Sequence, residues 1–481
     1  MKPLMPPLCA LLLIAASLAG CGSIGQTPNP ATVASAADLP AQWYSPLPHA
    51  GQVTELADWW RQFDDPVLVQ LVEAAQGVSP TLAAATARIE QARSTRSAAS
   101  AALGPTLDAT ASISRGRSDF VTPLGTSSSA NAQAAWELDL FGANRAGRDA
   151  AQARLDGAEA GWHDARVAVA AEVANSYVSL RGCEAQREQA RIDATSRGET
   201  SRLTELSTKA GFEAPANAAL ARASAAQSNN LLTQRKAQCD LLIKSLVALT
   251  AVPEPELRQR VAPGEMRQPQ PGPIAVASVP AQALAQRPDV FAAERELVAA
   301  SADVSQAQAQ RLPRITLAGS IGAARFESGD TTADGTLWQI GPLAVSLPIF
   351  DGGRRRANVA AAQARYTQAQ SDYRARLRTA VREVEEALVT LQSTAARGDD
   401  AQVASDGYAA SFRATEARYR GGLASLFELE DARRSATQSQ VQLIDLKSER
   451  SAAWIALYRA LGGGWSGPDR RAAAAPAATP Q

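Results

Sequence analysis

The sequence predicts a mainly helical chain with a small four-stranded membrane sheet, in which one unit of strands and a long helical hairpin occurs twice. Three observations predict this fold class: an internal repeat, two long helix-forming stretches that are each broken once, and four segments in which apolar and polar residues alternate. The composition agrees, because Ala is abundant and aromatic residues make up only 5% of the chain. Such a chain suits closely packed helices better than a thick globular core.

The bulk charge and the motif content exclude several classes of function. The formal net charge is zero, from 48 basic and 48 acidic residues, so the charge gives no reason to expect a nucleic-acid partner. The sequence has no H-x-x-x-H, C-x-x-C, P-loop or G-x-S-x-G pattern. We therefore expect no enzymatic activity and no cofactor. His163, one of two histidines, is explained better as a packing or surface residue than as a ligand.

The N-terminus has the pattern of a lipoprotein signal peptide over residues 1–20. Lys2 precedes an apolar run at 8–18, which is too short to span a bilayer as a helix. The letters "LAGC" resemble the bacterial lipobox, in which the chain is cut before the cysteine. Cys21 is then expected to carry covalent lipid, including palmitate, that holds the chain in a membrane. By the same resemblance, Gly22 in place of Asp favours the outer membrane. A plain signal peptide with an incidental cysteine is the alternative.

The internal repeat divides the rest of the chain. Residues 80–105 match residues 288–313 at an offset of 208, and Gly211 matches Gly422 at an offset of 211. The matches between these points keep the same order, which indicates a duplication. The predicted division is a lipid-anchored linker at 21–57, a first repeat at 58–251, a Pro-rich equatorial connector at 252–287, a second repeat at 288–464 and a disordered tail at 465–481.

Each repeat contains a very long helix-forming stretch, at residues 144–208 and 354–419. Apolar residues recur there at spacings of three and four, close to the coiled-coil repeat. About 65 residues at ~1.5 Å each make a rod of roughly 100 Å, which must pack against neighbours along its length. Glycines interrupt both stretches, so each is predicted to turn back as a hairpin with its tip near Gly211 or Gly422.

Two cysteines of the mature chain test the hairpin prediction. Cys183 lies 28 residues before Gly211 and Cys239 lies 28 residues after it. An antiparallel hairpin places them opposite each other, in a compartment that allows disulfides. We predict a Cys183–Cys239 disulfide that stabilises the fold by about 2–4 kcal/mol. Two unpaired buried cysteines are the alternative.

Four alternating segments predict strands between lipid and water. A sheet edge cannot face lipid, because unpaired backbone groups there cost several kcal/mol each, and four strands are too few to close on themselves. Two copies would give eight strands with a filled interior, and three would give twelve with room for water. The alternative is a soluble β-sandwich element. Polar loops at 116–129 and 327–335 are expected outside the cell. The predicted strands cover residues 106–115, 131–141, 314–324 and 337–350.

Five local motifs occur in order along the chain: "DWWRQFDDPVLVQLV" from Asp58, "AEVANSYVSLRG" from Ala171, "AGFEAPA" from Ala210, "QRPDVFAAERELVAASADV" from Gln286 and "YRGGLASLFELEDARRS" from Tyr419. Together with the architecture and the lipobox, they resemble the TolC/OprM-like outer-membrane factors. The resemblance covers essentially the whole mature chain and is greatest to the lipoprotein (NodT-type) branch that works with RND efflux systems. None of the motifs is catalytic.

The resemblance implies a homotrimer with a 12-stranded β-barrel in the outer membrane and a 12-helix α-barrel in the periplasm. Such channels dock a periplasmic membrane-fusion adaptor, which links them to an inner-membrane RND transporter. The implied function is a passive exit duct for drugs or other small molecules. The same fold also serves as the exit duct of type I protein secretion. A lipid-anchored helical tether without a pore is a further alternative, but it leaves the four strands unexplained, and a periplasmic enzyme comes third.

The resemblance also implies two functional regions. A periplasmic gate is expected at Glu428, Asp431 and Arg434, because a ring of three acids on a channel axis repels itself unless it is paired. The first hairpin has no acids at the aligned positions. Glu430 stands where the family pattern often has an apolar residue, and a solvated charge cluster at a helix start is the alternative. The tip residues expected to contact the adaptor are Lys209, Gly211, Phe212, Tyr419, Gly421 and Gly422.

Overall fold

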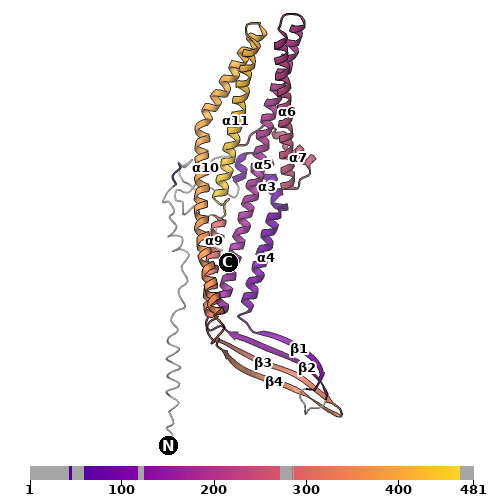
Figure 1. Cartoon of the computed structure of the whole chain (residues 1–481), viewed down its shortest axis with the longest axis vertical. Helices are drawn as coiled ribbons and strands as arrows, with labels where there is room; N and C mark the ends of the chain where they lie inside the picture. The colour runs from indigo at the N-terminus through magenta and orange to yellow at the C-terminus, as the bar shows by residue number, and fades with distance from the viewer. Residues whose placement is uncertain (1–42, 46–58, 118–123, 271–283, 285–286, 466–481) are drawn as a thin grey trace, which may run out of the picture. The chain divides into compact units, whose positions relative to one another are not determined.

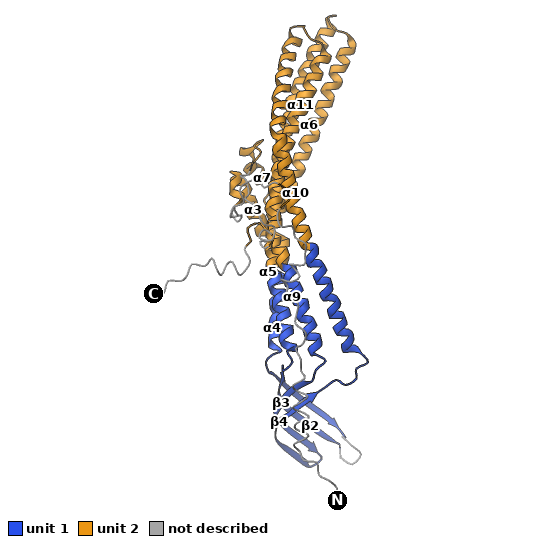
Figure 2. Cartoon of the chain, turned by 90° about the vertical axis from the view of Figure 1, so that its left-hand side faces the viewer, with its two compact units in different colours: residues 1–37, 87–159, 292–375 blue, residues 38–86, 160–291, 376–481 orange. Residues whose placement is uncertain are grey.

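The computed structural model describes residues 43–45, 59–117, 124–270, 284 and 287–465. The predicted signal peptide and Cys21 lie outside the described residues, as does most of the predicted tail. The chain divides into two compact units, which Figure 2 colours separately. The first unit comprises residues 1–37, 87–159 and 292–375, and the second comprises residues 38–86, 160–291 and 376–481.

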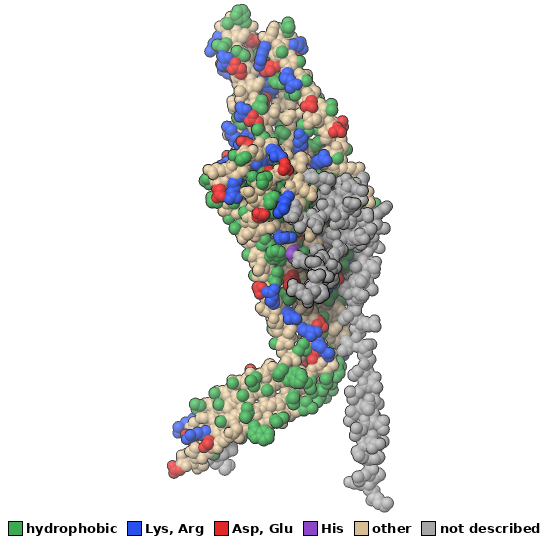
Figure 3. Space-filling model, turned by 180° about the vertical axis from the view of Figure 1, so that it is seen from behind, with side chains coloured by type: hydrophobic (Ala, Val, Ile, Leu, Met, Phe, Trp, Pro, Cys, Tyr) green, Lys and Arg blue, Asp and Glu red, His purple; other side chains and the backbone are tan. Residues whose placement is uncertain are grey.

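The first unit contains one antiparallel sheet with the strand order β1-β2-β3-β4 (Figure 1). The ladder places residues of one kind opposite each other: Leu107 pairs with Ala134, and Ile321 pairs with Trp338. One face of the sheet is therefore apolar and exposed, and Figure 3 shows hydrophobic side chains spread over it. The other face carries hydroxyl, amide and carboxylate groups, such as the bonded pair Ser112 and Ser129. The strands are β1 (Thr106–Gly116), β2 (Gly125–Leu138), β3 (Arg314–Ser328) and β4 (Thr331–Ser346).

The strands extend beyond the predicted segments at their loop ends. The predicted loop at 327–335 is only a two-residue turn, Gly329 and Asp330, because Ser328 pairs with Thr331. Most of the described part of the predicted loop at 116–129 is also strand, since β2 begins at Gly125. Backbone ladders form there without an alternating side-chain pattern, which is why alternation missed them. At the other end, β2 and β4 stop four residues or fewer before the predicted limits.

Small residues bring two helices of the first unit close together. Ala150 and Ala153 of α5 pack against Ala299 of α9, and Arg154 reaches across to Asp303 at 2.5 Å. Short side chains allow backbones to approach, so an Ala-rich sequence favours this contact. Among the described residues, no helix combines the length and the apolar character needed to cross a bilayer. Four helices contribute parts to this unit: α4 (Pro80–Ala101), α5 (Ala143–Lys209), α9 (Pro288–Ala309) and α10 (Arg354–Arg420).

The second unit contains the two helical hairpins. The first hairpin joins α5 to α6 (Pro215–Thr250), and the second joins α10 to α11 (Leu426–Ala460). Both turns have a glycine at positive φ, +79° at Gly211 and +73° at Gly422. Both have the same two backbone bonds, because the amides of Gly211 and Gly422 and of the residue after each return to the last helical turn. This is the glycine-capped helix end that the sequence predicts.

An apolar core surrounds the middle of the hairpins. Trp59 is fully buried and stacks on Tyr458 with ring centroids 5.0 Å apart. Tyr177 donates to Asp65 at 2.6 Å, and burial raises the pKa of this tyrosine. Part of the predicted connector is folded into this core, since Leu257 is buried. The short elements here are η1 (Trp59–Phe63), α3 (Pro66–Val78), α7 (Glu254–Val261) and η2 (Ala262–Gly264).

One predicted domain boundary is wrong by a residue. Trp465, which the sequence assigns to the tail, is only 5% exposed. Its ring lies 5.3 Å from that of Phe291, and it also lies near His163 at 6.3 Å. An indole of this size is stabilised by burial, so the second unit extends to this residue.

Candidate functional site

The hairpin tips expose apolar side chains. Phe212 is 85% exposed, and Leu423 and Phe427 at the second tip are also largely exposed. Lys209, Gly421 and Gly422 lie beside them on the surface. Exposed large apolar side chains on the turns of two polar hairpins are typical of a surface that binds another protein.

Tyr419 differs from the other predicted tip residues. Its side chain is partly buried and packs against a small cluster of Ala221, Leu426 and Leu429. Its hydroxyl lies 3.3 Å from Oγ1 of Thr204 on α5. Tyr419 therefore links the two hairpins to each other, and little of its side chain is free to face a partner.

The three predicted gate residues occupy two different environments. Glu428 forms a capping box at the start of α11: it accepts from the Ser425 amide at 2.7 Å, and its own amide donates to Oγ of Ser425 at 3.2 Å. The Ser425 amide and hydroxyl lower the pKa of the Glu428 carboxyl. Asp431 and Arg434 form an ion pair on the exposed face of α11, with side chains 56% and 67% exposed. Within the single chain, Asp431 and Arg434 therefore lie on the surface, whereas Glu428 caps the N-terminus of α11.

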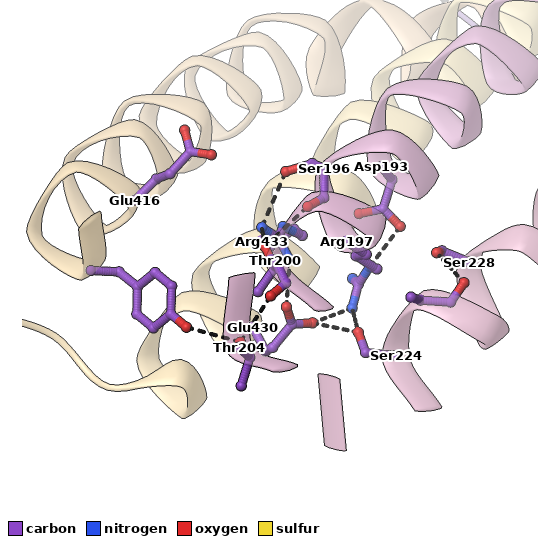
Figure 4. Close-up of polar contacts among 12 residues, drawn as sticks. Asp193, Ser196, Arg197, Thr200, Thr204, Ser224, Ser228, Glu416, Glu430 and Arg433 are labelled. Atoms are coloured by element: carbon purple, nitrogen blue, oxygen red, sulfur yellow. Dashed lines mark hydrogen bonds and ion pairs between the residues drawn. The ribbon is translucent and has the colours of Figure 1, made fainter. Parts of the chain in front are cut away.

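A charged network that the sequence did not reveal joins the two hairpins at the same end of α11; we call it the tip network (Figure 4). Arg197 of α5 donates to Asp193 at 2.9 Å and forms an ion pair with Glu430 of α11. Ser224 of α6 donates to the same Glu430 oxygen at 2.7 Å. The other oxygen of Glu430 pairs with Arg433. The Glu430 carboxylate thus connects α11 to both α5 and α6. The tip network consists of Asp193, Arg197, Ser224, Glu430 and Arg433.

Arg433 is the most deeply buried charge of the tip network, with 2% of its surface exposed. It donates to Oγ of Ser196 at 3.1 Å and to Oγ1 of Thr200 at 3.0 Å, both on α5. The Phe412 ring of α10 lies 5.4 Å from the guanidinium carbon. Burial lowers the pKa of Arg433, while Glu430 opposes that effect. Removing either partner would leave a charge away from water, so the tip network holds the hairpins in one arrangement.

The sequence spacing of the tip-network residues indicates ion pairs on shared helix faces. Asp193 and Arg197 are four residues apart, and Glu430 and Arg433 are three apart, so each pair shares a helix face. Leu426, Leu429 and Arg433 have the same spacing and are all buried. An arginine that continues an apolar stripe indicates a buried ion pair.

A disulfide joins the two cysteines in the structure, and next to it α5 also contacts α11. The Cα atoms of Cys183 and Cys239 are 5.6 Å apart across α5 and α6. Beside them, a Cβ atom at Gly182 would lie 2.5 Å from Oγ of Ser448, so a larger residue there would require the Ser448 hydroxyl of α11 to rotate away. The disulfide links α5 to α6, and the glycine contact places α5 against α11.

The chain is similar to known proteins over nearly its whole length. The outer membrane efflux protein family matches residues 71–252 and 279–463. The pyoverdine export outer membrane protein OpmQ of Pseudomonas putida is 31% identical over 479 residues, which are 96% of this chain and 98% of that protein. Outer membrane protein OprJ of Pseudomonas aeruginosa is 31% identical over 475 residues, 94% of this chain and 95% of that protein.

A solved structure agrees with the sequence relatives. The outer-membrane channel OprN has a TM-score of 0.78 at 27% identity, over 92% of this chain and 99% of that chain. The family match covers both repeats, so the hairpins, the sheet and the tips described above all lie within it. The chain belongs to the outer membrane efflux protein family and is the outer-membrane exit duct of an efflux system.

Proposed function

We propose that three copies of this chain form a continuous duct that passively conducts small molecules out of the cell. The observation that carries the proposal is the four-stranded sheet. Within the described residues, β1 and β4 each pair on one side only, and the apolar face between them is uncovered. Unpaired strand edges are not stable in lipid, and three sheets of four strands close into a barrel of twelve.

The partners follow from the tips and the N-terminus. The exposed Phe212, Leu423 and Phe427 suit a periplasmic membrane-fusion adaptor, which would connect the duct to an inner-membrane RND transporter. Lipid on Cys21 would add a membrane anchor. The names of the relatives mention pyoverdine export and solvent efflux, and we propose small molecules of that general kind as cargo. The duct itself performs no chemistry and needs no cofactor.

The closed state is proposed to depend on the hairpin ends. The tip network joins the two hairpins of one chain. Asp431 and Arg434 lie on an exposed face, which three copies could bring together on the channel axis. A channel narrowed by paired charges passes few ions until those pairs separate.

Cross-linking in native membranes and conductance in planar bilayers test the proposal. We expect a cross-linked species of three chains whose β structure requires heating to unfold, and a low conductance in the closed state. A deletion strain should become more susceptible to some antibiotics, dyes or solvents. A single chain that conducts no ions would exclude the duct and favour a tether, whereas a secretion defect without altered susceptibility would favour protein export.

A further inference from the structure

Glu385 of α10 holds a segment of the chain that lies far away in the sequence. Its Oε1 accepts from the backbone amide of Tyr44 at 2.7 Å, and its Oε2 accepts from the amide of Ser45 at 3.0 Å. Both carboxylate oxygens are used, on two successive amides. Hydrogen bonds to an ionised acceptor are about twice as strong as neutral ones.

Trp43, whose indole is buried, precedes these two amides in the chain. Trp43 is 7% exposed and belongs to the same apolar cluster as Val384 and Leu388, which flank Glu385 along α10. The side chain of Tyr44, in contrast, is 85% exposed. The segment is therefore held by its backbone and by one tryptophan.

The neighbouring acids on α10 have other roles. Glu383 binds Arg287 at 2.7 Å, and Glu386 pairs with Arg382 at 3.4 Å on the same helix. Glu385 instead binds main-chain donors. Tyr44 and Ser45 lie in a bend of the chain, which turns their two successive amides toward the same carboxylate. The site therefore recognises the shape of the backbone at this bend and fixes its position.

We propose that Glu385 and the core around Trp43 form a docking site for the chain's own N-terminal arm, with Trp43–Ser45 as its occupant. The inference rests in part on the proposed lipid at Cys21. The 22 residues that follow Cys21, up to and including Trp43, span at most roughly 75 Å when extended. The docked arm is then a tether of limited length between the lipid and the helical unit, and it restricts how far that unit can move from the membrane.

Chymotrypsin cleavage after Trp43 and Tyr44 measures docking directly in the full-length purified protein. In Glu385→Gln, one amide faces a carbonyl oxygen and the other faces an NH₂ group, so one bond is lost and the arm opens more often. We expect cleavage there to be roughly tenfold faster or more, in line with the loss of one charge-assisted hydrogen bond. The matched control, Glu386→Gln, should cleave at the wild-type rate. Equal rates in the two variants would overturn the proposal.

A second measurement guards against a variant that fails to fold. A spin label at Tyr44→Cys, whose side chain is exposed and makes no docking bond, should be clearly less mobile in the wild-type background than with Glu385→Gln. An equally mobile label in both backgrounds would also reject the site. The lipid is tested separately by the mass of the released N-terminal fragment: a fragment without lipid would refute the anchor and leave the docking site intact.

Discussion

The two hairpins have the same turn but are stabilised differently. Gly211 and Gly422 adopt similar positive φ angles and receive the same backbone bonds. The first hairpin is closed internally by the disulfide, and Ala214, the N-cap residue of α6, provides no side-chain cap. The second has no disulfide, but α11 begins with a capping box.

The difference shows how a duplicated unit can specialise. The first hairpin is held within itself, by a covalent link between its own two helices. The second hairpin is held to the first, because Glu430 and Arg433 of α11 bind side chains of α5 and α6. The backbone fold is common to both repeats, while the disulfide lies within the first hairpin and the tip network joins the second hairpin to the first.

Removing Glu430 should have the largest effect on this difference. Glu430→Ala leaves Arg433 buried without its carboxylate, which should lower the free energy of unfolding by about 3 kcal/mol. Thermal unfolding followed by circular dichroism measures this change. The variant channel should also leak, which planar bilayers would show as a higher closed-state conductance than wild type.

The exposed pair on the same helix is the control. The double variant Asp431→Ala/Arg434→Ala should change the free energy of unfolding by less than about 1 kcal/mol. Its conductance should nevertheless rise if the pair lines the gate. Unchanged conductance would remove both residues from the gate, and an equal loss of stability in the two experiments would mean that burial of the tip network is unimportant.

Opening the disulfide should have the next largest effect. Cys183→Ser/Cys239→Ser should lower the free energy of unfolding by about 2–4 kcal/mol, because the unfolded chain regains the freedom that the cross-link removed. Denaturant unfolding of the variant, beside wild type with and without reductant, checks this. A variant as stable as oxidised wild type would show that the first hairpin does not depend on its covalent link.

Changing the N-cap residues of α6 and α11 should have the smallest effect on stability. Ser425→Ala should destabilise the start of α11 by about 1 kcal/mol. Ala214→Ser should stabilise the start of α6 by somewhat less than this. Hydrogen exchange of the first-turn amides of α6 and α11 measures both.

The capping box also predicts a pH dependence. Because the folded-state pKa of Glu428 is lowered, its contribution is present above the pKa of the unfolded chain and is lost as the pH falls through the folded value. Protection of the α11 amides should therefore decrease in acid in wild type and change less in Ser425→Ala. The opposite trend would contradict the assigned role of Glu428.

The sequence predicts features that repeat or that have symmetrical spacing. The duplication, the turn glycines and the equal distances of Cys183 and Cys239 from Gly211 follow from counting. The strand ends do not, because the ladder continues through Ser, Thr and Ala residues that show no alternation. Spacing within each helix indicates a buried ion pair, but it does not identify the partners of Glu430 on the other hairpin. Arg197 and Ser224 lie 233 and 206 residues away in the sequence, and only the folded hairpins bring them together.

The sheet of the first unit has a consequence for the life of the protein before it reaches the membrane. Its apolar face is exposed in the single chain, and in the part of the chain that the structure describes, each edge strand pairs on one side only and leaves amides and carbonyls unpaired on the other. Such edges are templates for pairing with the wrong chain. A newly exported copy is therefore exposed to mispairing while it crosses the aqueous compartment, and protection of these edges on the way favours the accumulation of finished ducts.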